Sequence, residues 1–153
     1  MNLKKIEKFL DFYLKKFFEY PLQELNDQIC DSPNNYLIPP IVYQTWENNL
    51  FGKTHYKQIL KFRKINSDLT FLLFDKNKRD QYMKERWSNH EILKVYQKVK
   101  LGVMESDIFR YCILYDRGGY YFDISKGSKV SLRSLHKENS QAILSNEPVE
   151  CIV

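Results

Sequence analysis

The sequence predicts an α/β fold in which helices pack on a largely parallel sheet. Three short apolar or β-branched segments (residues 38–46, 70–74 and 120–124) alternate with longer segments of helical periodicity. Strands that alternate with helices are typical of parallel sheets, because a parallel pair needs a long crossover connection. A chain of 153 residues without internal repeats fits one such domain, preceded here by a helical segment.

The first 35 residues are expected to be helical and distinct from a domain formed by residues 36–153. Apolar side chains recur every three or four residues over 3–20, which predicts an amphipathic helix. Pro21 ends it, a short second helix is expected over 22–29, and residues 31–35 are loop by composition. Two prolines then lead into the β-branched and aromatic strand at 38–46.

The later elements follow from caps and apolar periodicity. We expect a helix over 55–65 and a strand at 70–74, whose continuous apolar run is typical of burial on both faces. Asp75 is placed to cap a helix over 76–87. Ser88 or Asn89 is placed to cap the following helix, which ends near residue 99. A helix over 103–117 is expected to stop at Gly118 and Gly119, and residues 141–145 predict a fourth strand.

Composition excludes several classes of protein. A 15% aromatic fraction argues against disorder, and no apolar run approaches the ~20 residues of a membrane span. Cys30, Cys112 and Cys151 have no metal-ligand spacing, and their odd number excludes a complete disulfide framework. A reducing, cytoplasmic location is therefore expected.

Positive charge gathers between Lys53 and Lys100, where 13 Lys/Arg and 5 Asp/Glu give a net +8 while the rest of the chain carries −3. Such a block is most often the solvated side of helices. The alternatives are nucleic acid, an anionic membrane or a phosphorylated substrate. We expect no nucleic-acid partner, because the sequence has no helix-turn-helix signature and no glycine-flanked aromatic motif.

The predicted helix over 103–117 carries two opposite charges. Asp107 and Arg110 are three residues apart and therefore share one helix face. Apolar residues occupy the other faces, so we expect the helix to be buried nearly all round. Charges placed there are costly unless they pair or bind a ligand. A satisfied internal ion pair and a ligand site both fit these residues.

Two further candidates come at the ends of predicted strands. Asp123 closes the strand at 120–124, and open α/β sheets bind ligands beyond the carboxyl ends of their strands. A carboxylate there either holds a hydroxyl or a divalent cation that bridges phosphates, or simply caps a turn. Trp46 closes the strand at 38–46 and is either a stacking surface for a planar base or a core residue.

Three segments taken together, IPPIVYQTW at 38–46, SDIFRY at 106–111 and GGYYFD at 118–123, resemble the glycosyltransferases with a DXD sugar-binding region. That group includes fungal initiating mannosyltransferases, bacterial capsule and lipooligosaccharide transferases and, more distantly, glucosylating bacterial toxins. The resemblance covers residues 38–132, and its specific part is the string Ser-Asp-x-x-Arg-Tyr…Gly-Gly-x-Tyr-x-Asp. It implies a GT-A fold, whose Rossmann-like half binds a nucleotide sugar.

The resemblance also implies roles for individual residues. Trp46 matches a residue near the nucleobase, and Asp107 and Arg110 match residues that hold the donor sugar and its phosphates. Asp123 matches the first Asp of the DXD motif, which contacts the ribose and the metal. The implied donor is a UDP- or GDP-sugar and the implied cofactor a divalent cation, Mn²⁺, whereas no catalytic residue is implied.

Two departures from the family pattern bear on function. Ser125 stands where the family has its second Asp, so the metal ligands reduce to Asp123 and the much weaker Ser125 hydroxyl. The chain ends 30 residues after Asp123, and we expect it to lack the family's acceptor-binding half. Two hypotheses follow. One is a glycosyltransferase that moves a hexose to a saccharide or lipid-linked acceptor, and the other is a truncated, non-catalytic module that binds nucleotide sugar.

The helix predicted over 3–20 has two interpretations of its own. It packs its Leu/Phe stripe on the core, which we favour, or it lies on an anionic membrane as a basic amphipathic helix. Peripheral membrane contact through residues 3–20 would suit a lipid-linked acceptor.

Overall fold

A three-stranded parallel sheet forms the centre of the protein. The computed structural model describes residues 3–17, 19–31, 37–124, 129–135 and 141–142. Strands β2 (Ile41–Thr45), β4 (Thr70–Phe74) and β5 (Tyr120–Tyr121) lie in the order β4-β2-β5. The register of β2 and β4 runs from Ile41↔Thr70 to Thr45↔Phe74, and Tyr43 pairs with Tyr121 on the other side. The predicted α/β architecture with a parallel sheet is confirmed.

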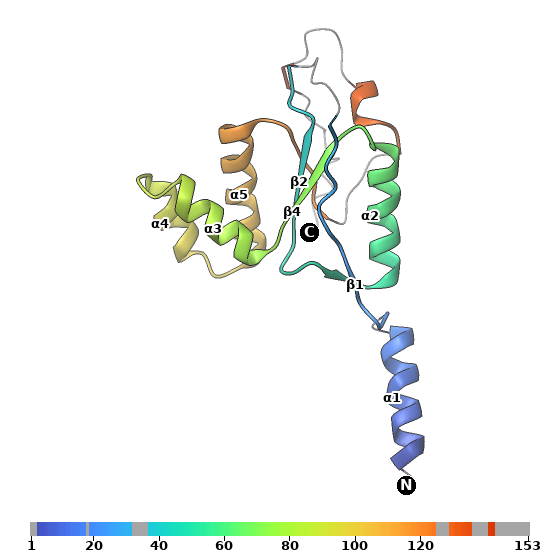
Figure 1. The fold of residues 1–153 in the computed structure, drawn as a ribbon. Coiled ribbons are helices and arrows are strands. Elements are labelled where there is room, and N and C mark those ends of the chain that lie inside the picture. The colour runs from blue at the N-terminus through green and yellow to red at the C-terminus, as the bar shows by residue number, and fades with distance from the viewer. Residues whose placement is uncertain (1–2, 18, 32–36, 125–128, 136–140, 143–153) are drawn as a thin grey trace, which may run out of the picture.

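Helices cover both faces of this sheet (Figure 1). Helix α2 (Lys53–Ile65) lies on one face, and α3 (Lys76–Arg86), α4 (Glu91–Lys98) and α5 (Gly102–Arg117) lie on the other. Successive side chains of a strand point to opposite faces. Val42 therefore packs in a cluster with Phe62 of α2, and Tyr43 in a second cluster with Phe109 of α5.

Local signals set most helix boundaries. The Asp75 carboxylate accepts a hydrogen bond from the Lys78 backbone N–H at 2.8 Å, as predicted for a cap of α3. Gly118 ends α5 with a φ of +64°, which favours glycine. The predicted cap of α4 is wrong. Neither Ser88 nor Asn89 caps it, because a turn closed by His90 N–H to the Trp87 carbonyl follows α3, and His90 Nδ1 is the cap.

The predicted helix over 22–29 is wrong, because this segment is extended. It contains strand β1 (Gln23–Glu24), which pairs antiparallel with β3 (Leu50–Phe51). Gln28 then exchanges two backbone hydrogen bonds with Phe71, at 2.9 and 2.7 Å. Bonding to the open edge of β4 thus outweighs the local helical preference. The division into residues 1–35 and 36–153 stays a prediction.

Helix α1 (Leu3–Phe17) projects away from the rest of the protein (Figure 1). Leu10 and Leu14 of its apolar stripe are exposed, as are Phe9 and Phe12 beside it, so the prediction that the stripe packs on the core is wrong. The reason is geometric: β1 and Gln28 run along the sheet edge, and α1 points away from that edge. No described helix is long and apolar enough to cross a membrane.

The C-terminal part of the sheet is shorter than expected. Strand β5 ends at Tyr121, although the Phe122 N–H still donates to the Tyr43 carbonyl at 3.1 Å. Residues 143–145 of the predicted fourth strand lie outside the described residues, and Gln141 and Ala142 are not in a strand. A short 3₁₀ helix, η1 (Leu132–Leu135), follows β5 and buries Leu132 against the α2 side.

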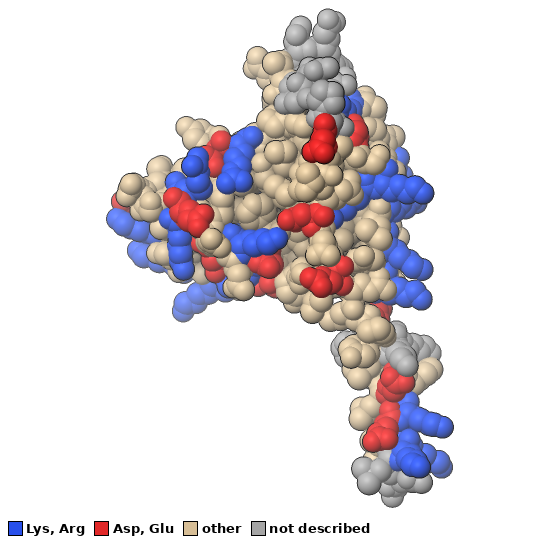
Figure 2. All heavy atoms as spheres, in the orientation of Figure 1, with Lys and Arg blue, Asp and Glu red and all other residues tan. Residues whose placement is uncertain are grey.

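The basic block between Lys53 and Lys100 lies mostly in solvent. All of its Lys and Arg side chains are exposed except Arg63, Lys76 and Arg79. They spread over the outer sides of α2, α3 and α4, with acidic residues interspersed (Figure 2). This distribution fits the expectation of solvated helix faces, while the expectation that nucleic acid is not a partner stays a prediction.

Candidate functional site

The carboxyl ends of β2 and β5 lie side by side where the sheet changes its direction of growth. From the central β2 the chain crosses through α2 to β4, then returns through α3, α4 and α5 to β5 on the opposite side of β2. At such a reversal, open α/β sheets bind ligands beyond the carboxyl ends of their strands. Trp46 directly follows β2, and Asp123 lies two residues beyond β5, so the topology places both at this edge.

Arg110 joins the two acidic candidates. Its Nη2 donates to Asp123 Oδ1 at 2.9 Å and lies 3.1 Å from Asp107 Oδ1. Asp107 and Arg110 come from one face of α5, and Asp123 comes from the loop after β5. The helical spacing and the parallel strand therefore bring together all three charged residues that the sequence singled out.

This cluster is open to solvent, contrary to the expectation of a helix buried nearly all round. The side chains of Asp107, Arg110 and Asp123 are 50%, 32% and 46% exposed. Helix α5 packs one face on the sheet and α3, whereas Tyr115 on the other face is 87% exposed. The Arg110 pairs are therefore a solvent-accessible cluster, and a fully internal ion pair is excluded.

The ring of Tyr121 is the fourth member of this cluster, and the Arg110 guanidinium lies over its face. Arg110 Cζ lies 4.6 Å from the centroid of the Tyr121 ring, a cation–π contact. Burial acts against the charge of Arg110, but Asp123, Tyr121 and Asp107 together raise its pKa above the ordinary value. Burial, followed by the charge of Asp123, raises the pKa of Tyr121 to about 12. A charged guanidinium and a neutral phenol therefore persist across the physiological pH range.

Trp46 lies at the same edge but on the other face of the sheet. Trp46 is 42% exposed, and its ring lies 6.4 Å from that of Phe51 and 6.3 Å from that of His55, measured between centroids. His55 belongs to the first turn of α2, whereas Arg110 belongs to α5 on the opposite face. The structure thus leaves Trp46 apart from the charged cluster, with an open ring.

The described residues do not fit a cation held by the protein. Ser125 lies outside the described residues, and Asp123 already accepts from the Arg110 guanidinium. Asp107 contacts the same guanidinium group. Neither carboxylate is therefore surrounded by the further oxygen ligands that Mg²⁺ or Mn²⁺ prefers. Among the described residues no group of three or more His, Cys, Asp or Glu could hold a metal ion.

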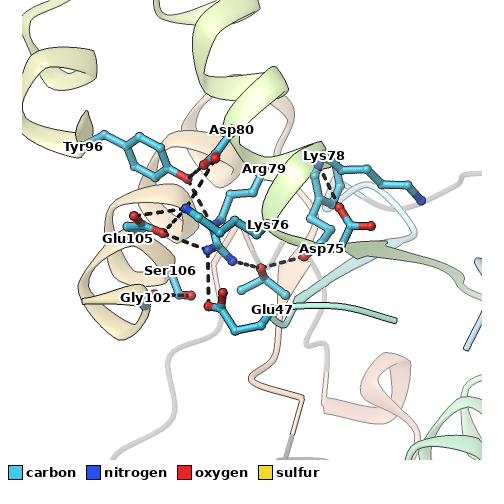
Figure 3. Close-up of polar contacts among 12 residues, drawn as sticks. Glu47, Asp75, Lys76, Lys78, Arg79, Asp80, Tyr96, Gly102, Glu105 and Ser106 are labelled. Carbon is cyan, nitrogen blue, oxygen red and sulfur yellow. Dashed lines mark hydrogen bonds and ion pairs between the residues drawn. The ribbon is translucent and has the colours of Figure 1, made fainter. Parts of the chain in front are cut away.

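Sequence reasoning missed a second polar cluster beside this site (Figure 3). Its centre is Arg79 of α3, which is fully buried and bonds to Glu105 in the first turns of α5. Arg79 belongs to a run of charged residues without apolar periodicity, so nothing in the sequence distinguished it from its solvated neighbours. Glu105 offered a weak signal, since it directly precedes the Ser106–Asp107 motif.

The fold and the charged cluster define an α/β domain that carries an arginine and two carboxylates at the carboxyl edge of its sheet. Residues 48–147 match the family described as glycosyltransferase sugar-binding region containing DXD motif. The match begins just after Trp46 and includes Asp107, Arg110 and Asp123. Because it covers most of the chain, the protein belongs to this family of glycosyltransferases. Its α/β fold is consistent with the Rossmann-like half of a GT-A enzyme.

Three curated fungal relatives are similar to the chain. The mannosyl phosphorylinositol ceramide synthase of Saccharomyces cerevisiae is 27% identical over 76% of the chain and 30% of its own length. The initiation-specific alpha-1,6-mannosyltransferase of Candida albicans is 28% identical over 69% of the chain and 29% of its own. The inositol phosphoceramide mannosyltransferase 1 of Schizosaccharomyces pombe is 24% identical over 86% and 42%. The chain thus spans less than half the length of these relatives, and no solved structure matches it.

Proposed function

We propose that this chain is the nucleotide-sugar-binding part of a glycosyltransferase that moves a hexose from a nucleoside-diphosphate sugar to a saccharide or lipid-linked acceptor. The observation that carries the proposal is the Arg110 cluster at the carboxyl edge of β2 and β5. A guanidinium binds phosphate oxygens through a planar fork of donors. Both carboxylates contact Nη2, and the Arg110 side chain is 32% exposed although its Nε is buried, so the outer part of the guanidinium stays within reach of a ligand.

The two carboxylates and the tryptophan suit the remaining parts of such a donor. Asp107 and Asp123 accept hydrogen bonds from hydroxyl groups of the sugar and the ribose, and their exposure leaves both reachable. Trp46 offers an open aromatic face for the base on the α2 side of the same edge. The named relatives are mannosyltransferases, so mannose is the first sugar that we propose.

Arg110 also supplies the electrostatic part of the reaction. Negative charge develops on the departing diphosphate as the sugar leaves, and a fixed cation at that position lowers the barrier. Family members generally bind their donor with a divalent cation, and Mn²⁺ is our proposal for that ion. No described group of His, Cys, Asp and Glu could hold such an ion by itself, so the charge compensation that we propose comes from Arg110.

Calorimetry with a panel of UDP- and GDP-sugars, with and without manganese, tests the proposal. We expect one donor to bind and Arg110→Ala to lose that binding. Arg117→Ala, at the end of the same helix and away from the sheet edge, is the matched control and should bind normally. Absence of binding to every donor at millimolar concentration would exclude the function.

A non-catalytic module that binds nucleotide sugar is the second candidate. Ser125 favours it, because a hydroxyl replaces the carboxylate that the family uses beside the metal. Donor binding with neither transfer nor hydrolysis would support the module over the enzyme. A Ser125→Asp variant that gains manganese affinity would show that the geometry for a metal site persists.

We further propose that α1 contacts an anionic membrane surface on the cytoplasmic side. The helix exposes Leu10 and Leu14, and Lys5 and Lys8 lie on its solvated sides. An apolar stripe flanked by lysines is the composition of interfacial helices. Most of the protein should sediment together with phosphatidylglycerol vesicles, and a smaller fraction should sediment with neutral phosphatidylcholine vesicles. Equal retention after Leu10→Glu and Leu14→Glu would contradict the proposal.

A further inference from the structure

The polar cluster around Arg79 connects the two segments that carry the candidate donor site. We define the Arg79 cluster by its members, which come from the end of β2, from α3, from α4 and from the first turns of α5: Thr45, Glu47, Lys76, Arg79, Asp80, Tyr96 and Glu105 (Figure 3). Arg79 lies at its centre in Figure 3, with Glu105 and Tyr96 to one side and Glu47 below.

Every donor group of the Arg79 side chain has a partner. Nη1 donates to Thr45 Oγ1 at 2.7 Å, Nη2 to Glu105 Oε2 at 3.0 Å, and Nε to the Tyr96 hydroxyl at 3.2 Å. The guanidinium is fully buried. Burial acts against its charge, but Tyr96 and Glu105 raise the pKa of Arg79 above the ordinary value. Arg79 is therefore a permanently charged side chain whose three donor groups are held toward Thr45, Tyr96 and Glu105.

The partners of Arg79 lie next to both parts of the candidate site, Trp46 on one side and the Asp107–Arg110 pair on the other. Thr45 directly precedes Trp46, and its Oγ1 also donates to the Phe74 carbonyl at 2.7 Å. Glu47 directly follows Trp46 and lies 3.7 Å from Arg79 Nη2. Glu105 is two residues before Asp107 in α5. One guanidinium thus holds the turn after β2 and the start of the helix that carries Arg110.

A close approach between the same two segments supports this arrangement. Gly102 begins α5, and a Cβ atom there would lie 2.5 Å from Glu47 Oε1. The Glu47 carboxylate therefore lies against the first turn of α5, in the space that a side chain at position 102 would otherwise take. Lys76 reinforces the contact, since its Nζ donates to Glu105 Oε2 at 3.0 Å and its backbone N–H to the Glu47 carbonyl at 3.4 Å.

We infer that Arg79 is a positioning residue for nucleotide-sugar binding, which sets the distance between Trp46 and the Asp107–Arg110 pair through Thr45 and Glu105. The inference rests on the proposed function and goes beyond it, because Arg79 touches neither Trp46 nor the Arg110 cluster. The planar fork is essential: a lysine provides the charge but cannot hold Thr45, Tyr96 and Glu105 in three fixed directions.

The test uses Arg79→Lys, Glu105→Gln and Thr45→Val, each in a Trp87→Phe background that leaves Trp46 as the sole tryptophan. Glu105→Gln and Thr45→Val keep the shape of the side chain, so they remain informative if the buried lysine variant fails to fold. Arg86→Lys is the matched control, because Arg86 lies on the same helix, is exposed and pairs with Asp116 at the far end of α5.

Two measurements are made on each variant. Without any ligand, the emission maximum of Trp46 and its quenching by acrylamide report the position of the turn after β2. With the donor identified by calorimetry, we expect about a tenfold loss of affinity in all three variants, because Trp46 and Arg110 are then no longer held at the spacing that the donor needs. Arg86→Lys should change neither quantity.

Folded variants that keep the emission of Trp46 and bind the donor within about twofold of the parent would overturn the inference. This result differs from a failure of the proposed function, in which the parent protein itself binds no nucleotide sugar. In that case the emission and quenching of Trp46 still decide whether Arg79 positions the turn.

Discussion

Asp123 illustrates how position in the chain gives an ordinary residue a specific partner. It lies two residues beyond β5, and its carboxylate accepts a hydrogen bond from Arg110, which is 13 residues earlier in the sequence and belongs to α5. The i, i+3 spacing predicted that Asp107 and Arg110 share a helix face, and the resemblance to the glycosyltransferase family grouped Asp123 with them. The exposure of the cluster was not predictable, because it depends on what packs on the outer face of α5.

We predict that Asp123→Asn separates stability from binding. The pair with Arg110 is about half exposed, and such pairs contribute roughly 0–1 kcal/mol, so the free energy of unfolding in urea should change by no more than that. Donor affinity should fall about tenfold, because a hydroxyl then loses its charged acceptor. A loss of several kcal/mol with unchanged affinity would instead indicate a structural ion pair.

Tyr82 gives a prediction at alkaline pH. Burial, its first cause, raises the pKa of Tyr82 from 10.0 to about 12, and the hydroxyl donates to Asp116 at 3.0 Å. The unfolded chain ionises first as the pH rises. The neutral Tyr82 hydroxyl therefore contributes its full stabilisation of the folded state below pH 10, and this contribution is lost between pH 10 and pH 12.

In Tyr82→Phe the decline of unfolding free energy over that range should be smaller by about 2 kcal/mol. At neutral pH the variant should lose about 1 kcal/mol with the hydrogen bond. Urea unfolding at several pH values measures both effects. Parallel declines in the variant and the parent would show that Tyr82 does not titrate differently in the folded state.

At the scale of elements, the turn between α5 and β5 depends on glycine. Gly119 has a φ of +88°, and a Cβ atom there would lie 2.6 Å from the Ile41 carbonyl oxygen. We predict that Gly119→Ala lowers the free energy of unfolding by about 3 kcal/mol, because the strained backbone cannot move away from β2.

Gly102→Ala is the matched control, measured by the same urea unfolding. Its Cβ atom would meet the end of the Glu47 side chain, which can move, so the change should stay below about 1 kcal/mol. Equal effects of the two alanines would contradict the argument from backbone strain.

Helices and strands differed in how far the sequence determined them. Helices α2, α3 and α5 and strands β2 and β4 follow from caps and apolar periodicity, which are local. The segment over 22–29 does not, because its backbone bonds to Phe71 from more than 40 residues away. The role of Arg79 is similarly non-local, since its partners lie on β2, α4 and α5.

For the whole molecule, α1 is expected to contribute to surface binding and little to stability. Most of its described apolar side chains are exposed, so deletion of residues 1–17 should leave the free energy of unfolding within about 1 kcal/mol of the parent. The same deletion should abolish retention by phosphatidylglycerol vesicles. A large loss of stability would show that α1 packs on the body of the protein in solution.

The position of the donor site at the reversal of the sheet is the central claim, and an NMR titration of the ¹⁵N-labelled protein with uridine and guanosine diphosphates tests it most directly. The amide signals that shift with one of them should belong to residues 46 and 47, to the first turns of α5 and to the residues around Asp123. Shifts confined to the outer sides of α2 or α4, or no shift with either nucleotide, would contradict it.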